Sequence, residues 1–596
     1  MCGICGELRF DGAAPDRDAV ARMTQRLARR GPDDAGFFSD AAAALGHRRL
    51  SVIDLSAHAH QPMVDEALGL ALVFNGTIYN YRELRAELEG LGYRFFSEGD
   101  SEVVLKAWHA WGSACVERFC GMFAFAIRDR AAGTLALARD RFGIKPLYYS
   151  LDGARLRFAS TVQALLAGGG VDTAIDPVAL HHHFTLHTVV PAPRTLLAGV
   201  RKLEPATTVV FSGSGASTQR RYWWLEATRP ARVRTQAEWL AETRGVLARA
   251  LERHRLAADV PVGVLLSGGL DSSLLVAMLA GHVEDLLTFS VGFEEVGEGA
   301  EAADEFEYSD LVAERFRTRH HRYRISNAEV LERLPEAVAC MSEPMASHDV
   351  IAFYLLAERV SREVKVALAG QGADEVFGGY FWYPLMDAET GTPLERFRRH
   401  YFDRDHAEYL EMMEPAWHVG DVTARMVGEA LAEPGADTFL DRVWRFDVTT
   451  LIVDDPVKRV DNMPMSWGLE VRVPFLDHEV VELAARMPPG LKLKEGGKYP
   501  LKAIARGLVP DAVIDRPKGY FPVPALKYVR GQFLELMRGI LDSHTCRGRG
   551  LYRRAYVEKL LSDPEAHFTR IRGSKLWHLA VLEWWLQVNV DPASSR

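Results

Sequence analysis

The sequence of 596 residues predicts two domains of different fold class. We expect an α+β domain with antiparallel sheets, then an α/β domain with a parallel sheet and a helical C-terminal part. The length exceeds what one hydrophobic core usually supports. The first part mixes short β segments with amphipathic helices, whereas the second part repeats strand, helix and strand. The predicted domains are residues 2–215 and 236–596.

Short alternating or β-branched segments predict the strands of the first domain. They include GLALVFNGTIYN, GMFAFAIRDR, GTLALARDRFG and RLRFAS. RDAVARMTQRLARR and YRELRAELEGLG have the spacing of amphipathic helices. The small, polar stretch SGSGASTQR at 212–220 is typical of a turn or of the approach to a domain boundary.

The second domain opens with a helix, QAEWLAETRGVLARALERHRL. The strand VPVGVLLSGG, the helix LDSSLLVAMLAG and the strand LLTFSVGF follow it in order. This rhythm predicts a parallel sheet with helices on both faces. Beyond residue 390 the sequence is largely helical and ends in SKLWHLAVLEWWLQVNV.

Composition and charge narrow the class of protein. Hydrophobic residues make up 48% of the chain and the formal net charge is −9, which indicates a globular protein without a nucleic-acid partner. The first thirty residues lack the pattern of a signal peptide, and no apolar run is long enough to cross a bilayer. We therefore expect a cytoplasmic protein with no membrane partner, whose six cysteines are reduced.

Three glycine-rich stretches of the second domain indicate phosphate chemistry. SGGLDSS (267–273) lies between a strand and a helix, where backbone N–H groups bind anions, and Asp271 suits Mg²⁺. A Walker loop is absent. In ALAGQGADEVFGGY, Asp374 could be a second Mg²⁺ ligand or a helix cap. GGKYPLKAIARGLVP offers Lys498 and Lys502 to stabilise leaving phosphate.

The opening MCGICGEL places Cys2 where removal of Met1 would expose it. A metal site would need two more soft ligands, and the sequence has no second C-x-x-C pair. A redox pair belongs after a strand inside a fold. A free α-amine on Cys2, with a pKa of roughly 7.7–8.0, could instead act as general base toward its own thiol.

Together with RRGPDD, GHRRLSVIDLS, FNGTIYNYRELR, EGDSE and RDRFGIKPLYY, this opening resembles the class II glutamine amidotransferases in order and spacing. SGGLDSS resembles the pyrophosphate loop of the ATP pyrophosphatases. Both parts together identify the chain as a member of the asparagine synthetase family. The resemblance implies an N-terminal-nucleophile sandwich, an ATP-pyrophosphatase sheet, ATP and Mg²⁺, small-molecule substrates and a possible homodimer.

The resemblance also implies roles for single residues. Cys2 would attack glutamine, and Asn75 and Gly76 would stabilise the oxyanion, although Asn-Gly is also typical of a type I′ turn. The residues expected around glutamine are Arg49, Leu50, Val52, Asn75, Gly76, Thr77 and Asp100. Those expected around ATP are Leu265, Ser267, Gly268, Gly269, Asp271, Ser272, Val291, Gly370 and Gln371, with Lys502 and Gln371 as catalytic groups. Asp100 could also cap a helix.

Three residues depart from the asparagine synthetase pattern. Thr77 and Gln371 replace glutamates, and Asn462 stands where an arginine is common. The loss of a carboxylate at residue 371 suits an acceptor whose amine is blocked. The segments 342–356, 453–477, 516–524 and 569–586 look most similar to N-acetylglutaminylglutamine amidotransferases. We therefore expect that dipeptide as acceptor, with asparagine synthetase as the alternative and a scaffold without turnover as a third hypothesis.

Overall fold

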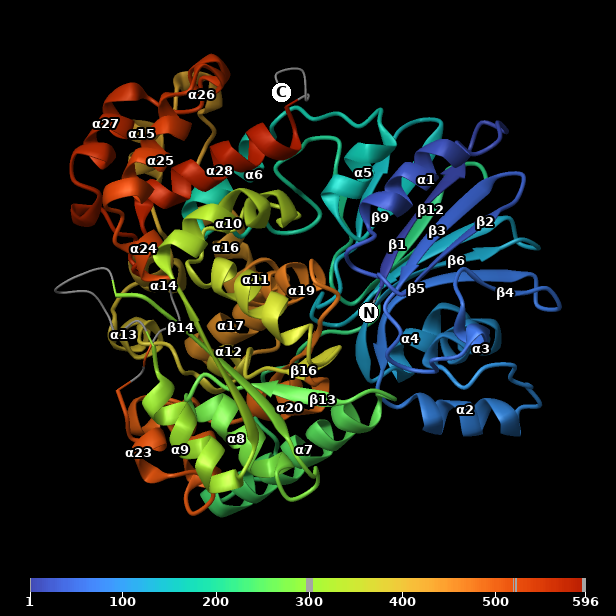
Figure 1. Cartoon of the computed structure of the whole chain (residues 1–596), viewed down its shortest axis with the longest axis horizontal. Coiled ribbons are helices and arrows are strands. Elements are labelled where there is room, and N and C mark those ends of the chain that lie inside the picture. The colour runs from blue at the N-terminus through green and yellow to red at the C-terminus, as the bar shows by residue number, and fades with distance from the viewer. Residues whose placement is uncertain (1, 296–303, 518, 520–522, 592–596) are drawn as a thin grey trace.

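Two domains lie side by side in the computed structural model, which describes residues 2–295, 304–517, 519 and 523–591 (Figure 1). The domain drawn in blue to teal contains two antiparallel sheets, and the domain drawn in green to red contains one parallel sheet and many helices. This architecture confirms the predicted fold class.

The N-terminal domain is a sandwich of two six-stranded sheets. The first sheet runs in the order β10 (Arg201–Lys202), β8 (Tyr148–Leu151), β9 (Arg155–Ala159), β1 (Gly3–Arg9), β3 (Ala43–Arg49), β2 (Asp34–Ser39). The second runs β12 (Ser217–Arg221), β11 (Thr207–Phe211), β7 (Thr134–Arg139), β6 (Gly121–Asp129), β5 (Leu70–Ile78), β4 (Met63–Asp65). Buried apolar side chains of both sheets form one cluster between them, among them Leu45 and Val73. The apolar residues of the alternating pattern in the sequence therefore point into a core that the two sheets share.

The stretch 212–220 is part of a β-hairpin. Ser217–Arg221 pairs with Thr207–Phe211, so the second sheet continues to Arg221 and the expected boundary at residue 215 falls in the turn. The helices of this domain are α1 (Arg17–Arg26), α2 (Tyr81–Gly90), α3 (Asp100–Trp111), α4 (Cys115–Arg118), α5 (Val162–Gly168) and α6 (Pro177–Thr185).

The parallel sheet of the C-terminal domain has the order β15 (Arg319–Ile325), β14 (Leu287–Phe293), β13 (Val262–Leu265), β16 (Val366–Leu368), β17 (Glu470–Arg472). The predicted entry helix is α7 (Gln236–Leu256), and α8 (Leu270–Leu279) follows β13 directly. Consequently the SGGLDSS loop lies at the carboxyl end of a central strand, where α/β sheets bind ligands.

Helices make up most of the rest. They are α9 (Phe306–Phe316), α10 (Asn327–Cys340), α11 (Asp349–Val360), α12 (Ala373–Phe377), α13 (Trp382–Ala388), α14 (Pro393–Tyr401), α15 (His406–Met412), α16 (Val422–Ala432), α17 (Phe439–Phe446), α18 (Ile452–Asp454), α19 (Pro456–Met465), α20 (His478–Ala485), α21 (Pro489–Lys492), α22 (Tyr499–Ala505), α23 (Asp511–Ile514), α24 (Pro524–Lys527), α25 (Gly531–Asp542), α26 (His544–Arg549), α27 (Arg554–Ser562) and α28 (Lys575–Asn589). Among the described helices, none combines the length and apolar character needed to span a membrane.

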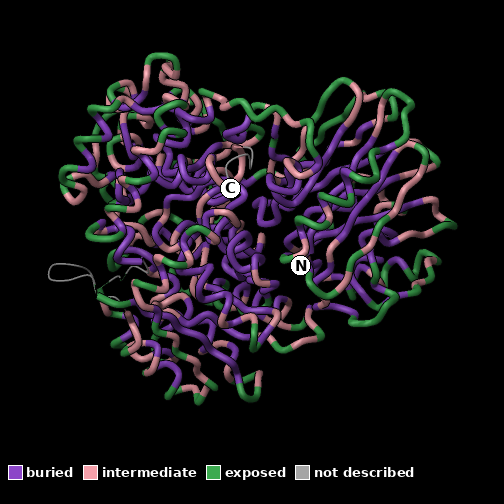
Figure 2. The backbone as a smooth tube through the Cα atoms, turned by 45° about the horizontal axis from the view of Figure 1, so that its top comes forward, coloured by how far each residue is buried: buried purple, intermediate pink, exposed green. Residues whose placement is uncertain are grey.

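Buried ionic contacts join the two domains, and buried segments fill the interior of both (Figure 2). Asp461 of α19 accepts from Arg30 Nη1 at 2.9 Å and from Lys145 Nζ at 3.1 Å. Glu343 accepts from Lys202 Nζ at 3.0 Å. Because both cations that contact Asp461 belong to the N-terminal domain, separating the domains would leave this buried carboxylate without them.

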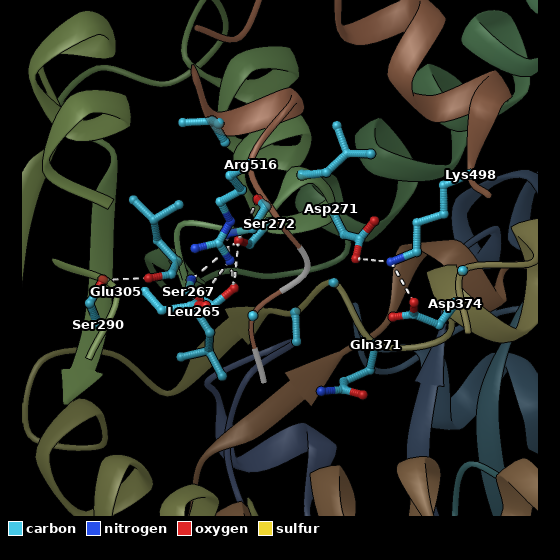
Figure 3. Close-up of a pocket in the computed structure, with 18 of the residues that line it drawn as sticks. Leu265, Ser267, Asp271, Ser272, Ser290, Glu305, Gln371, Asp374, Lys498 and Arg516 are labelled. Atoms are coloured by element: carbon cyan, nitrogen blue, oxygen red, sulfur yellow. Dashed lines mark hydrogen bonds and ion pairs between the residues drawn. The ribbon is translucent and has the colours of Figure 1, made fainter. Parts of the chain in front are cut away.

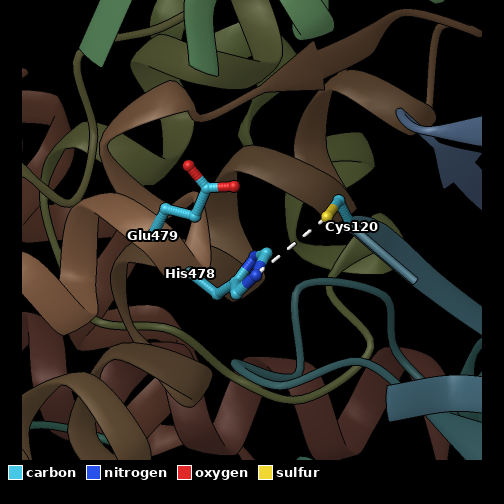
Figure 4. A group of neighbouring side chains, drawn as sticks. All are labelled: Cys120, His478 and Glu479. Carbon is cyan, nitrogen blue, oxygen red and sulfur yellow. Dashed lines mark hydrogen bonds between the residues drawn. The ribbon is translucent and has the colours of Figure 1, made fainter. Parts of the chain in front are cut away.

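One group of possible metal ligands also crosses this interface (Figure 4). Cys120 Sγ, next to β6, lies 4.0 Å from His478 Nε2, at the start of α20. The neighbouring Glu479 carboxylate accepts from Arg253 Nη1 at 2.6 Å. The glutamate is thus engaged in an ion pair, and we treat the group as part of the interdomain packing.

Candidate active sites

Cys2 lies immediately before β1 and is buried. Its backbone nitrogen donates to Asn75 Oδ1 at 3.0 Å, and its carbonyl accepts from Arg30 Nε at 3.2 Å. Burial raises the pKa of the thiol, while a backbone hydrogen bond with Leu50 and the charge of Arg49 oppose that rise. A thiol in this position needs a nearby base to become a nucleophile at neutral pH.

Asn75 and Gly76 lie within β5, so the type I′ turn that was expected of them in addition is wrong. They pair with Ala124 and Phe123 of β6, and a Cβ on Gly76 would lie 2.3 Å from the Met122 carbonyl oxygen. The Asn75 Oδ1 atom is taken by Cys2, whereas its buried Nδ2 has no hydrogen-bond partner among the described residues. That donor is therefore available next to the thiol.

Arg49 ends β3, and Leu50 and Val52 lie in the loop that follows; all three are buried. The Arg49 guanidinium donates to the carbonyl oxygens of Ser56, at 3.1 Å, and of Asp54. The loop also contacts the C-terminal domain, because the Val52 carbonyl accepts from the Asp259 nitrogen at 2.8 Å. The arginine is thus held near Cys2 by a loop that both domains support.

Asp100 is the first residue of α3 and is buried. Its carboxylate accepts from the backbone nitrogen of Ile78 at 3.0 Å, which ties it to the end of β5 and not to its own helix. The helix-cap alternative is therefore not seen. Burial raises the pKa of Asp100 to about 6, although the hydrogen bond from Ile78 opposes the rise. We call Cys2, Arg49, Asn75 and Asp100 the thiol site.

The SGGLDSS loop joins β13 to α8. Ser272 Oγ accepts from the Ser267 backbone nitrogen at 3.2 Å, and the two hydroxyl oxygens lie 3.1 Å apart. Gly268 has a φ of 75°, and a Cβ there would lie 2.8 Å from the Ser309 nitrogen. The loop therefore needs glycine at its turn and leaves the start of α8 open to an anion.

Lys498 lies between the two carboxylates expected to bind Mg²⁺ (Figure 3). Its Nζ is 2.6 Å from Asp271 Oδ2 and 2.8 Å from Asp374 Oδ1, and although burial opposes it, the two charges raise the lysine pKa. Carboxylates close enough to share one ammonium form a hard oxygen donor set that also fits Mg²⁺. Lys502 lines the same cavity, but its Nζ donates to the Glu495 carbonyl oxygen.

Gly370 and Gln371 follow β16, and Gly370 faces the start of α8. A Cβ on Gly370 would lie 2.9 Å from the Asp271 Cβ, so only glycine allows this approach. Gln371 Oε1 accepts from Arg459 Nη2 at 3.4 Å. The arginine on α19 is a residue that the sequence reasoning did not single out, because this contact spans 88 residues.

One cavity of about 340 Å³ collects most of the residues expected around ATP. They are Leu265, Ser267, Gly269, Asp271, Ser272, Val291, Gly370 and Gln371, together with Asp374, Lys498 and Lys502. Arg516 also lines it and donates to Glu305 Oε2 at 2.8 Å, at the Ser267 end in Figure 3. Sequence reasoning missed both members of this pair, although Arg516 lies in the RPKGYFPVP segment. We call this space the loop cavity.

Comparison with known proteins covers both domains. The family model described as "Asparagine synthase" matches residues 242–587, and the one described as "Glutamine amidotransferase domain" matches residues 1–223. The chain belongs to the asparagine synthase family. The glutamine-hydrolysing asparagine synthetases 1 and 3 of Bacillus subtilis are 32% and 31% identical, over 99% and 98% of this chain and 97% and 98% of their own lengths. Amidase chry2 of Gibberella zeae is 29% identical over 88% of this chain and 89% of its own length.

In this asparagine synthase family member, Thr77 contacts the other domain. Its Oγ1 donates to Glu470 Oε1 at 3.2 Å, where β17 of the parallel sheet meets β5. Burial would raise the pKa of Glu470, but Arg472 and Lys145 hold it at about 2. A carboxylate from the C-terminal domain thus lies next to Thr77, which no local sequence pattern could indicate.

Asn462, the third departure from the family pattern, has a structural contact. Its Oδ1 accepts from the Ser342 backbone nitrogen at 2.6 Å. The amide thereby fixes the segment after α10 against α19. An arginine could not accept this hydrogen bond, because a guanidinium only donates.

Proposed function

We propose that this chain is a glutamine-dependent amide ligase that activates a carboxylate with ATP and forms AMP and pyrophosphate. The observation that carries the proposal is the presence in one chain of the thiol site and of Lys498 between two carboxylates in the loop cavity. The first arrangement suits release of ammonia from glutamine, and the second suits phosphate chemistry. The names of the two Bacillus relatives agree with this combination.

At the thiol site, the α-amine freed by removal of Met1 would accept the proton of the Cys2 thiol. The sulfur would then attack the side-chain carbonyl carbon of glutamine, with Arg49 on the α-carboxylate and Asp100 on the ammonium. Asn75 Nδ2 and the Gly76 N–H would stabilise the oxyanion. Cleavage of the C–N bond releases ammonia and leaves a γ-glutamyl thioester, which water hydrolyses to glutamate.

In the loop cavity, the acceptor carboxylate would attack the α-phosphate of ATP, giving an acyl-adenylate and pyrophosphate. Asp271 and Asp374 would hold Mg²⁺, which neutralises phosphate charge. Lys498 and Arg516 would stabilise the charge on the leaving pyrophosphate, with Lys502 at the edge of the cavity. Ammonia then attacks the acyl carbon, and the carboxamide and AMP leave.

We further propose N-acetylglutaminylglutamine as the acceptor. The supporting observation is that Gln371, on the acceptor side of the cavity, is neutral and accepts from Arg459. Free aspartate brings an ammonium that a buried site must pair, whereas the acetylated dipeptide brings none. Asparagine synthesis is the alternative, favoured by the names of the relatives.

The test is a product assay with ATP, Mg²⁺, glutamine and one acceptor at a time. We expect AMP, pyrophosphate and the amidated dipeptide in equal amounts. Formation of ADP would contradict the adenylation step, and efficient asparagine formation would favour the alternative. Absence of turnover with every acceptor would favour a scaffold.

A further inference from the structure

A second cavity of about 150 Å³ adjoins the loop cavity. Helix α12 contributes to both walls, because Asp374 lines the loop cavity and Glu375 lines the second one. The Gln371 to Arg459 hydrogen bond also connects the two linings, since Gln371 belongs to the first and Arg459 to the second. The two cavities therefore share a wall formed by α12 and by the Gln371 to Arg459 contact.

Three segments far apart in the sequence meet in this cavity. They are residues 342–356, 453–477 and 569–586, represented in the lining by Asp349, Arg459 and Arg572. These same segments look most similar to N-acetylglutaminylglutamine amidotransferases. The segments on which the proposed acceptor depends thus meet around one cavity.

The charged groups of the inner wall are already engaged with neighbouring side chains. Glu375 Oε1 accepts from Tyr380 at 2.6 Å, and Asp447 accepts from Tyr383. Arg459 donates to Asp455 Oδ1 at 2.9 Å. Only Arg459 and Asp455 form an ion pair in these contacts, whereas Glu375 and Asp447 accept from neutral tyrosine hydroxyls, and burial raises the pKa of both carboxyls. Hydrogen-bonded carboxyls held toward their neutral form suit an acceptor body with uncharged polar groups.

Aromatic and basic side chains complete the lining of the second cavity. Trp382 and Tyr401 line it from α13 and α14. Arg572 lies exposed at the outer end, with its Cζ 4.8 Å from the centre of the Phe381 ring. A guanidinium presents several N–H donors in one plane, which suits the carbonyl oxygens of amides.

We propose that the second cavity binds the body of the acceptor, an acylated, amide-rich peptide whose carboxylate extends past Gln371 into the loop cavity and whose far carbonyl groups contact Arg572. This inference rests on the proposed function and adds to it the place and the chemistry of acceptor recognition. Arg572 acts as a specificity residue that contacts the substrate away from the reacting atoms.

The experiment pairs one variant with two acceptors of different length. Arg572→Gly removes the guanidinium at a position whose φ is 67°, so glycine adds no backbone strain. We expect the KM for N-acetylglutaminylglutamine to rise about tenfold, as for loss of a hydrogen bond from a charged donor, with kcat little changed. The KM for N-acetylglutamine should stay the same, because the shorter molecule does not reach Arg572. Glutaminylglutamine, which carries a free ammonium, should be a poorer substrate than the acetylated dipeptide.

Arg570→Ala is the matched control, since the Arg570 guanidinium donates to the Phe402 carbonyl at 2.8 Å and does not line the cavity. It should leave both KM values unchanged. An equal effect of Arg572→Gly on both acceptors, or no effect on either, would overturn the inference while the amidation activity stands. If the unmodified protein does not amidate the dipeptide at all, the proposed acceptor itself fails.

Discussion

The thiol site and the loop cavity stabilise charge by different physical means. In the thiol site, the atoms that would stabilise charge are mostly neutral and fixed by strand pairing, such as the Asn75 amide in β5. In the loop cavity, charged side chains from distant segments compensate one another, as Lys498 does between Asp271 and Asp374. The Asn75 and Gly76 donors of the thiol site come from one short motif in β5, whereas the ion pairs of the loop cavity depend on contacts between distant segments.

The largest expected effect is the loss of glutamine-dependent synthesis while ammonia-dependent synthesis remains. Cys2→Ala should lower glutamine-dependent synthesis by more than about 10⁴-fold, because the thiol is the nucleophile. Synthesis from free ammonia should persist, because the loop cavity is unchanged. The measurement is amide formation with each nitrogen source.

Cys5→Ala is the control for this variant, since the Cys5 thiol lies 3.3 Å from Thr24 Oγ1 and belongs to the core. It should retain both reactions. Loss of the ammonia-dependent reaction in Cys2→Ala would contradict two independent sites.

A change in the loop cavity should give the opposite pattern. Asp271→Asn should slow AMP formation by about 10³-fold, because it removes a carboxylate that would hold Mg²⁺. Glutamine hydrolysis should continue, as followed by glutamate release. Asp285→Asn, an exposed position with a φ of 50° that asparagine tolerates, should change neither activity. Equal loss of both activities in Asp271→Asn would point to coupled domains.

Asn75→Ala tests the unpartnered donor. We expect glutamine hydrolysis to fall by about 10²- to 10³-fold, the usual cost of losing one oxyanion donor, with ammonia-dependent synthesis unaffected. Steady-state rates with glutamine and with ammonia make the comparison. A rise in KM alone, with kcat unchanged, would assign Asn75 to binding and not to transition-state stabilisation.

The smallest expected effect concerns acid stability at the junction of the domains. The pKa of Glu470 is lowered from 4.5 to about 2, so its stabilising contribution is complete above pH 4.5 and disappears as the pH falls toward 2. Calorimetric melting temperatures from pH 7 to pH 3 should therefore decline. Glu470→Gln should be less stable at pH 7 and show a shallower decline, and an unchanged slope would contradict this assignment.

The sequence predicted the fold class and the positions that surround Cys2, because these depend on local strand patterns and short motifs. It placed Asn75 and Gly76 in a possible turn, because the dipeptide preference ignores the register that keeps them in β5. It offered Lys498 and Lys502 together, and only the turn before α22 decides that Lys498 reaches the carboxylates. Arg459 and Glu470 were missed, because their contacts join segments far apart in the chain.

The most direct test of the account is a competition assay with glutamine labelled with ¹⁵N at its side-chain amide. The protein, ATP and Mg²⁺ are mixed with equal amounts of N-acetylglutaminylglutamine and aspartate, and the products are identified by mass spectrometry. We expect ¹⁵N in the new carboxamide of the dipeptide, matched by equal amounts of glutamate, AMP and pyrophosphate. Asparagine as the main labelled product, or ADP in place of AMP, would contradict it.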